Sequence, residues 1–215
     1  HKGGYIAFRF DITDKITTGN NLIAVTVDNR IIQEIAPLSG DFTFYGGIYR
    51  KVHIIVADPV HVDLMDNGAS GLYLSTMNVS QTSAQLEMKA KIINETNEPK
   101  EVTLRASLKN PDTFEAIAEV SKPAFNVNSM KPGGPALNTL ERTVTIPAGG
   151  THEFKEKISI QNPRLGNGKA DPYRYQVDFN VIQSGQTIDA VTEYVGFRYL
   201  SANKQGFFLN GSLYP

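Results

Sequence analysis

The sequence predicts an all-β protein whose largest domain is an antiparallel sandwich of two sheets. Three segments, at residues 84–92, 102–109 and 173–181, alternate between apolar and polar side chains. Alternation with a period of two marks a strand that buries one face. Turns rich in glycine, proline and asparagine separate these segments, and no stretch shows a convincing helical period. About seven short strands joined by such turns are typical of a sandwich.

Further strands are expected where short apolar runs lie between turn residues. They are Gly71–Val79, Phe114–Val120, Thr143–Ile146, His152–Ile160 and Ile188–Val195. The segment Lys122–Thr139 is rich in proline, glycine, asparagine and serine, which predicts a long loop. Alternation assigns the core to the inward faces of the long strands. That core includes Leu86, Leu104, Tyr175, Val177 and Phe179.

Proline and sequence pattern divide the chain into three parts. Pro59 cannot donate to a sheet ladder and therefore favours a connection, which places the first boundary at Asp58. The three parts are residues 1–58, 59–200 and 201–215. The first part contains two strand-like segments, Asn21–Asn29 and Val52–Ala57.

Composition removes several classes of function. The 215 residues carry a net charge of −1 without a Lys/Arg cluster, so no nucleic-acid partner is expected. No apolar run approaches the roughly 18 residues of a membrane span, so no membrane partner is expected either. Cysteine is absent, which excludes disulfides, thiolate zinc sites and a cysteine nucleophile but leaves the compartment undecided. The four histidines lack close metal-ligand spacing, so no metal site is predicted.

The most informative stretch is Gly40–Val52, which reads GDFTFYGGIYRKV. Its Gly46-Gly47 pair permits a sharp turn. Asp41 supplies a carboxylate beside several aromatic rings, a combination that suits sugar hydroxyls and sugar ring faces. The same residues also fit a structural turn with aromatic packing, and chemistry alone leaves both interpretations open.

The order of several motifs resembles glycoside hydrolase family 2, the family of β-galactosidases and β-glucuronidases. The resemblance covers nearly the whole chain and is densest at both ends, whereas residues 80–147 carry no such motif. Besides Gly40–Val52, the matching motifs are His1–Thr13, Gly19–Leu22, Val25–Asn29, Asn162–Leu165, Asp171–Tyr173, Gly196–Arg198 and Gly206–Gly211.

The resemblance implies a fold for each part of the chain. Residues 1–58 would be the C-terminal part of a sugar-binding, galactose-binding-like jelly roll. Residues 59–200 would be an immunoglobulin-like β-sandwich, and residues 201–215 would lead into a catalytic barrel. A jelly roll needs about eight strands, so residues 1–58 form only part of one. They should expose strand edges and apolar surface unless a partner or self-association covers them.

The resemblance also implies the chemistry. Family members hydrolyse β-glycosides with retention, using two glutamates of the barrel, so no catalytic residue is expected in this chain. Asp41 lies nine residues before Arg50, where the family places an acid that contacts sugar hydroxyls and, in some members, a bound cation. Asp41 is therefore the predicted substrate-binding residue. The expected partners are a β-glycoside and the barrel in cis, and no other cofactor is expected.

Three further details concern acidic residues outside the predicted site and one departure from the family motifs. Asp11 and Asp14 are better explained as turn acceptors than as a catalytic pair, and Asn94-Glu95 as a solvated hairpin turn. Relatives commonly carry tryptophan where this chain has Gly166. A stand-alone β-sandwich module for carbohydrate binding or adhesion is the alternative function.

Overall fold

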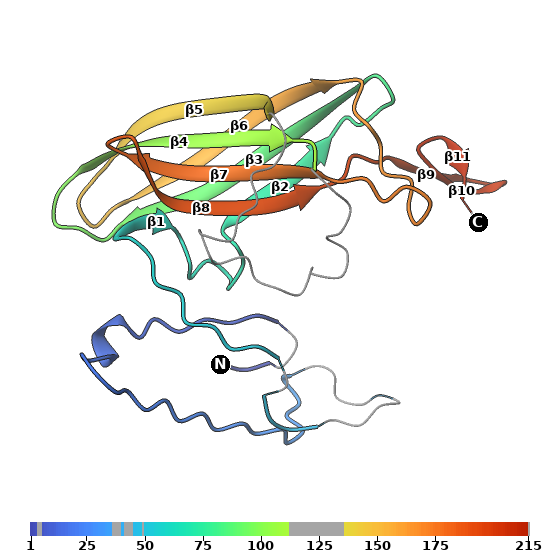
Figure 1. Cartoon of the computed structure of the whole chain (residues 1–215). Coiled ribbons are helices and arrows are strands. Elements are labelled where there is room, and N and C mark those ends of the chain that lie inside the picture. The colour runs from blue at the N-terminus through green and yellow to red at the C-terminus, as the bar shows by residue number, and fades with distance from the viewer. Residues whose placement is uncertain (4–5, 36–39, 41–44, 49, 112–135, 215) are drawn as a thin grey trace. The chain divides into compact units, whose positions relative to one another are not determined.

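The computed structural model describes residues 1–3, 6–35, 40, 45–48, 50–111 and 136–214 (Figure 1). The chain forms two compact units. Unit 1 comprises residues 1–56 and 65–69, and unit 2 comprises residues 57–64 and 70–215. Within the described part of the chain, no helix is long and apolar enough to cross a membrane.

Unit 2 is an antiparallel β-sandwich, as the sequence predicts. In the first sheet, β3 pairs with β1, β2 and β6, and the second sheet has the order β5-β4-β7-β8. Figure 1 shows the two sheets as stacked layers. The strands of the first sheet are β1 (Val60–Val62), β2 (Leu72–Met77), β3 (Ser83–Asn94) and β6 (Thr151–Gln161); those of the second are β4 (Lys100–Lys109), β5 (Ala136–Ile146), β7 (Tyr175–Gln183) and β8 (Gln186–Val195).

One apolar core fills the space between the sheets. Buried and partly exposed residues alternate along most of β3 and much of β4, because successive side chains point to opposite faces of a sheet. Phe154 of β6 meets Phe179 of β7 edge to face, with ring centroids 4.9 Å apart. The predicted core is confirmed, since each of its members is at most 4% exposed: Leu86, Leu104, Tyr175, Val177 and Phe179.

Strand limits differ from the expectation at β5. This strand begins at Ala136, so the C-terminal end of the predicted loop Lys122–Thr139 is wrong. Pairing with β4 accounts for the difference, because Thr139 lies opposite Ser107 and their hydroxyls are 3.3 Å apart. A partner strand thus extends a segment whose composition favours a loop. The predicted strand Phe114–Val120 lies outside the described residues.

Asn94 is not solvated, contrary to the expectation of a fully exposed turn. Its side chain is 1% exposed, and its Nδ2 lies within 3.1 Å of the carbonyl oxygens of Glu98, Ile146 and Pro147. Its Oδ1 accepts hydrogen bonds from the backbone and the hydroxyl of Thr96. Because a buried carboxamide needs partners for its donors and its acceptor, the surrounding turns close around Asn94.

Asp189 of β8 fastens the short strand β1 to the opposite sheet. Its Oδ2 accepts a hydrogen bond from the Val62 backbone N–H at 2.8 Å, and its Oδ1 accepts one from Ala190 at the same distance. Burial raises the pKa of the Asp189 carboxyl. The two backbone donors and the charge of His61 oppose that rise, and Asp58 adds to it.

Unit 1 lacks the strands that the sequence predicts. Among its described residues, none belongs to a β-strand, and the regular element is a 3-10 helix, Thr13–Lys15. The expected strands Asn21–Asn29 and Val52–Ala57 run as irregular chain, since a ladder needs a hydrogen-bonded neighbour.

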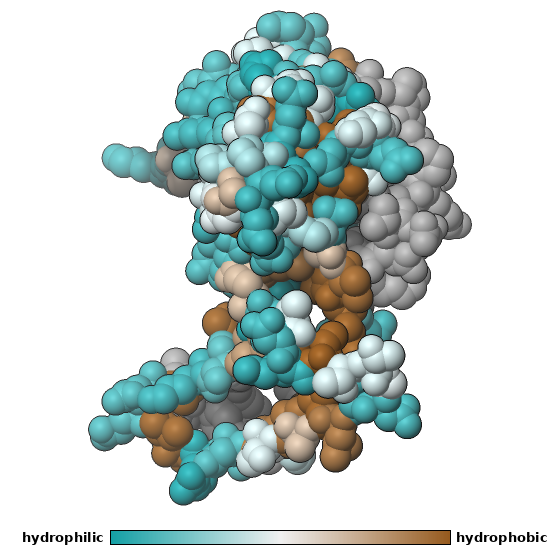
Figure 2. All heavy atoms as spheres, turned by 90° about the vertical axis from the view of Figure 1, so that its left-hand side faces the viewer, coloured by the Kyte–Doolittle hydropathy of each residue, from teal (hydrophilic) through white to brown (hydrophobic). Residues whose placement is uncertain are grey.

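Most of the described apolar side chains of unit 1 are exposed, as expected. Val25 is 62% exposed, Ile54 is 74% exposed and Val56 is 91% exposed. Figure 2 shows hydrophobic residues at this surface among hydrophilic ones. The alternating pattern therefore marks side chains that would suit a sheet face, and the described residues of unit 1 do not bury them.

Leu104→Ala should destabilise unit 2 by about 2–5 kcal/mol, because Leu104 is fully buried between the sheets. Urea unfolding followed by circular dichroism measures this loss. Glu101→Ala, an exposed change on the same strand, should alter the free energy of unfolding by less than about 0.5 kcal/mol. Equal effects of the two substitutions would contradict the assigned core.

Asp189→Asn should remove one pH-dependent part of the stability. Because folding raises the pKa of Asp189, the folded protein holds this proton more tightly than the unfolded chain does. The resulting stabilisation is complete below about pH 4 and is lost as the pH rises through the raised pKa. Wild type should therefore lose stability relative to the variant over this range.

Urea titrations at several pH values between about 4 and 7 measure this difference. The asparagine variant keeps only one of the two oxygen acceptors. This loss lowers its free energy of unfolding by an amount that does not depend on pH. Glu101→Gln serves as an exposed control and should track wild type. A difference between wild type and Asp189→Asn that stays constant with pH would contradict the prediction.

Candidate functional site

The predicted sugar-binding residue, Asp41, lies outside the described residues. Its described neighbours show why the motif needs glycine. A Cβ atom on Gly46 would lie 3.2 Å from the side chain of Asn29, and Gly47 adopts φ +104°, which favours glycine. Gly46 therefore lies beside Asn29, the last residue of another matching motif. Tyr45 is 85% exposed there.

Two aspartates of unit 1 act as turn acceptors. Asp11 accepts a hydrogen bond from the backbone N–H of Thr13 at 2.9 Å, which confirms its predicted role. Asp28 accepts hydrogen bonds from the backbone and the guanidinium of Arg30. This contact holds the pKa of Asp28 at about 2, so the carboxylate stays charged.

In unit 2, the motif residues of Asn162–Leu165 and Asp171–Tyr173 form one loop cluster. Arg164 Nη2 donates to Asp171 Oδ1 at 2.9 Å, and its guanidinium carbon lies 4.2 Å from the centre of the Tyr173 ring. The backbone N–H of Arg164 donates to the hydroxyl of Tyr175 at 2.8 Å. The ion pair and the ring contact hold Arg164 across the loop.

An aromatic cluster supports this loop from below. Tyr175 makes edge-to-face contacts with Tyr173 and Phe197, with centroid distances of 5.0 and 5.2 Å. The Tyr173 hydroxyl donates to Asn110 Oδ1 at 2.7 Å. Burial raises the pKa of both tyrosine hydroxyls, so they remain neutral hydrogen-bonding groups.

Gly166 packs too tightly for a large side chain. Its N–H donates to the carbonyl of Phe197 at 2.9 Å. A Cβ atom there would lie 3.0 Å from the carbonyl oxygen of Tyr173, so a larger residue requires that backbone to move. The absence of a side chain at Gly166 therefore lets its backbone pack closely against the backbones of Tyr173 and Phe197.

A small sheet follows the sandwich. Its order is β11-β10-β9, formed by Ser212–Leu213, Gly206–Leu209 and Leu200–Asn203. Asn210 and Gly211 connect β10 to β11, and both adopt positive φ angles, of 52° and 84°. This is the conformation that an Asn-Gly hairpin turn prefers.

Asn210 ties this small sheet to the loop cluster. Its side chain is buried, and its Nδ2 donates to the carbonyl of Gly166 at 3.0 Å and to Asn167 Oδ1 at 2.7 Å. Its Oδ1 accepts the backbone N–H of Tyr199 at 3.0 Å. Sequence reasoning placed Asn210 only within a motif. The Asn-Gly pair is a signal from which the turn could have been predicted, but no local signal indicates what the side chain contacts.

Two of the described histidines, His61 and His1, have structural contacts. His61 is buried, and its Nδ1 lies 2.6 Å from the carbonyl oxygen of Asp58. His1 stacks on Phe8 with ring centroids 4.2 Å apart. Among the described residues, no group of three or more His, Cys, Asp or Glu side chains could hold a metal ion.

These features define an all-β module in which a sandwich holds a loop cluster and a docked C-terminal sheet. The family model for glycosyl hydrolases family 2 matches residues 72–198, more than half of the chain. A β-glucuronidase from Bacteroides fragilis is 36% identical over 217 aligned residues, which cover 100% of this chain and 28% of that protein. A β-galactosidase from Bacteroides ovatus is 29% identical over 97% of this chain and 21% of its own length.

Solved structures agree with these sequence matches. The crystal structure of a β-glucuronidase from Bacteroides uniformis has a TM-score of 0.70 and 29% sequence identity, covering 87% of this chain and 20% of that one. The chain belongs to glycosyl hydrolases family 2. It spans 20–28% of the length of these relatives.

Asn210→Gly should loosen the small sheet without straining the turn, because glycine accepts positive φ. The variant leaves the Tyr199 N–H and the Gly166 carbonyl without their side-chain partner. Losing a buried partner costs about 1–3 kcal/mol, so amide hydrogen exchange within β9 and β10 should become about 5- to 150-fold faster.

Asn203→Gly provides the matched control. Asn203 Oδ1 accepts a hydrogen bond from the backbone N–H of Gln205 within an exposed turn, and among the described residues its side chain makes no hydrogen bond to the loop cluster. Its loss should leave exchange at Tyr199 unchanged. Unchanged exchange in Asn210→Gly as well would show that the side chain of Asn210 does not hold the sheet.

Proposed function

We propose that this chain is the non-catalytic part of a retaining β-glycoside hydrolase. The observation that carries the proposal is the similarity to a β-glucuronidase along the whole chain, together with the family match over the sandwich. β-Glucuronides and β-galactosides are the substrate classes to test first, because relatives of both names match.

The proposed chemistry needs two carboxyl groups that this chain does not supply. In a retaining enzyme they stand about 5–5.5 Å apart, and one forms a covalent glycosyl intermediate. A structural relative, β-glucuronidase 2 of Bacteroides uniformis, is described as covalently bound to a cyclophellitol-6-carboxylate aziridine. A covalent adduct of this kind supports a nucleophilic mechanism for the family. We place both carboxyl groups in a catalytic barrel outside residues 1–215.

Each part of the chain has a proposed role. Residues 1–58 belong to the sugar-binding jelly roll, residues 59–200 form the sandwich that holds it against the barrel, and residues 201–215 lead towards the barrel. The change of compact unit after Val56 supports a boundary near Asp58, although residues 65–69 belong to unit 1 as well. The docking of Asn210 on the loop cluster would fix the direction in which the chain leaves the sandwich.

Asp41 is proposed to contact sugar hydroxyls in the active site of the full-length enzyme. The nine-residue spacing between Asp41 and Arg50, with the glycine turn at Gly46-Gly47 between them, supports this role. A carboxylate that accepts hydroxyl hydrogens makes charge-assisted bonds of about 1.5–3 kcal/mol. We also predict a cation beside Asp41 in the full-length enzyme, because carboxylate oxygens are the ligands that hard cations prefer.

Residues 1–215 alone should not hydrolyse chromogenic β-glucuronides or β-galactosides, whereas the full-length enzyme should. Proton NMR of the first-formed sugar should show retained β configuration with the full-length enzyme. Turnover by residues 1–215 that a substitution within them abolishes would overturn the proposal. Inversion of configuration would overturn the retaining mechanism.

In the full-length enzyme, Asp41→Asn should lower kcat/KM by about 10- to 100-fold and leave Tm nearly unchanged. The substitution keeps the size of the side chain and removes the charge that sugar hydroxyls bind. Asp14→Asn, an exposed change in the 3-10 helix, is the matched control and should alter neither quantity. Normal kinetics in a destabilised Asp41→Asn enzyme would mean that Asp41 only stabilises its turn.

A further inference from the structure

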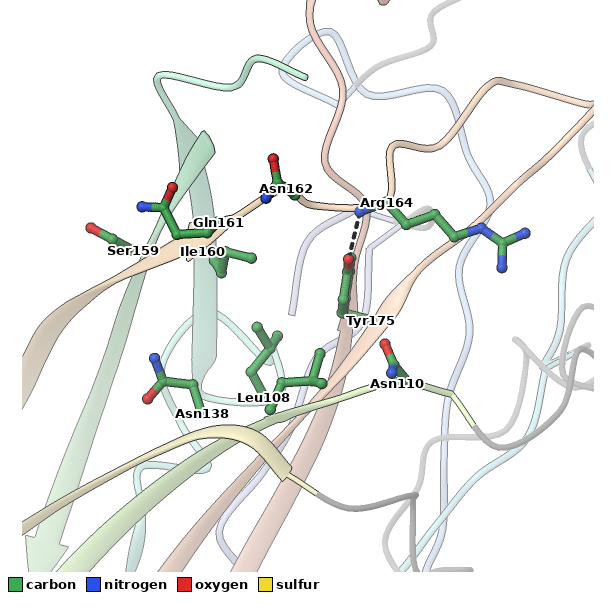
Figure 3. A pocket seen from close by; sticks show the side chains of 10 residues that line it. Leu108, Asn110, Asn138, Ser159, Ile160, Gln161, Asn162, Arg164 and Tyr175 are labelled. Atoms are coloured by element: carbon green, nitrogen blue, oxygen red, sulfur yellow. Dashed lines mark hydrogen bonds between the residues drawn. The ribbon is translucent and has the colours of Figure 1, made fainter. Parts of the chain in front are cut away.

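One open end of the sandwich holds a pocket of about 410 Å³ (Figure 3). It lies where β4, β5, β6 and β7 begin or end, within unit 2. Its volume falls at the lower end of the roughly 300–1,000 Å³ of small-molecule sites. The pocket is separate from the Asp41 motif in the chain and is not used by the proposed hydrolysis.

The floor of the pocket is apolar. Leu108 of β4 is 1% exposed and Tyr175 of β7 is 4% exposed, so both are fixed by the core behind them. Figure 3 shows Leu108 and Ile160 pointing towards each other across the space, with the Tyr175 ring beside them. This surface offers rigid contact to the C–H face of a ligand.

The rim is formed by carboxamides that have hydrogen-bonding groups to spare. Among the described residues, the side chains of Asn138 and Asn162 make no hydrogen bond with the protein, and Asn110 uses only its Oδ1, for Tyr173. A carboxamide carries two donors and one acceptor oxygen. A hydroxyl also donates and accepts, so each rim group can pair with a hydroxyl in either direction.

Among the described residues that line the pocket, no charged side chain is free. Arg164 is the one charged side chain among its lining residues, and its guanidinium is paired with Asp171 and stacked on Tyr173. Figure 3 shows that its guanidinium reaches away from the space between Leu108 and Ile160. A charged ligand would therefore lose its hydration without gaining an opposite charge, which favours a neutral one.

We propose that this end of the sandwich is a second carbohydrate site, which binds one or two neutral pyranose residues. Apolar floor residues would lie against the ring, and the rim carboxamides would pair with its hydroxyls. The site would bind saccharide units that are remote from the glycosidic bond to be hydrolysed. Its failure would leave the proposed hydrolase function untouched, because that function does not use these residues.

NMR titration of the 215-residue chain tests the site with cellobiose, lactose and methyl β-glucuronide. The two neutral disaccharides should shift the side-chain amide signals of Asn138 and Asn162 with a Kd on the order of millimolar. The charged glucuronide should bind more weakly. Absence of saturable shifts at these amides, or tighter binding of the glucuronide, would overturn the proposal.

Two variants remove rim groups while keeping the backbone. Asn138→Ala and Asn162→Gly should each weaken binding by about three- to tenfold, the effect of one lost hydrogen bond. Glycine suits position 162 because Asn162 has φ +46°. Asn180→Ala and Ser184→Gly, which lie outside the pocket lining, are the matched controls and should bind as wild type does. Equal loss in variants and controls would place the site elsewhere.

Discussion

The contact between the two sheets is the constraint on which the rest of unit 2 depends. Phe154 and Phe179 meet across the layers, and alternate side chains of the long strands fill the space around them. Without cysteine, no disulfide can take over this task. Burial of apolar surface, at about 25 cal/mol per Å², therefore has to stabilise the sandwich. The core also positions the loop cluster at the end of the sandwich, because Tyr175 packs in the core and its hydroxyl accepts a hydrogen bond from Arg164 of the loop.

Polar side chains add what the core cannot supply. Asn94 closes the turns at one end of the sandwich, and Asn210 holds the small sheet at the loop cluster. In both places, a carboxamide satisfies backbone groups that would otherwise be buried without partners. Two asparagines thus organise regions where strands stop and the chain must turn. Their burial also makes both poor positions for substitution.

The sandwich could be predicted because alternation is a local property. Leu86 and Leu104 follow from it directly, since a residue and its second neighbour share one face of a strand. The start of β5 could not be predicted, because its pairing with β4 joins residues about 30 positions apart. The same limit applies in unit 1, where Val25 and Ile54 alternate as strand residues do but stay exposed. A pattern shows which face a strand would bury, and the neighbour decides whether it does.

The candidate site follows the same rule. Motif order led to Asp41 and to the motifs that contain Arg164 and Asn210, because these are visible along the chain. The contacts of Asn210 and the spare carboxamides of Asn138 and Asn162 depend on segments that meet only after folding. Neither the composition nor the spacing of residues along the chain indicates contacts between such distant segments. Functional surfaces built from several strand ends are therefore the part that sequence reasoning is least able to find.

The attachment of β1 has a mechanical consequence. Residues 57–59 lead directly into this strand, so tension along that segment acts first on β1. Backbone pairs with β3 and the Asp189 carboxylate on β8 resist it together. The load is thereby divided between the two layers instead of peeling one edge strand away. A pull on the N-terminal side of the sandwich would have to break contacts with both sheets before β1 could detach.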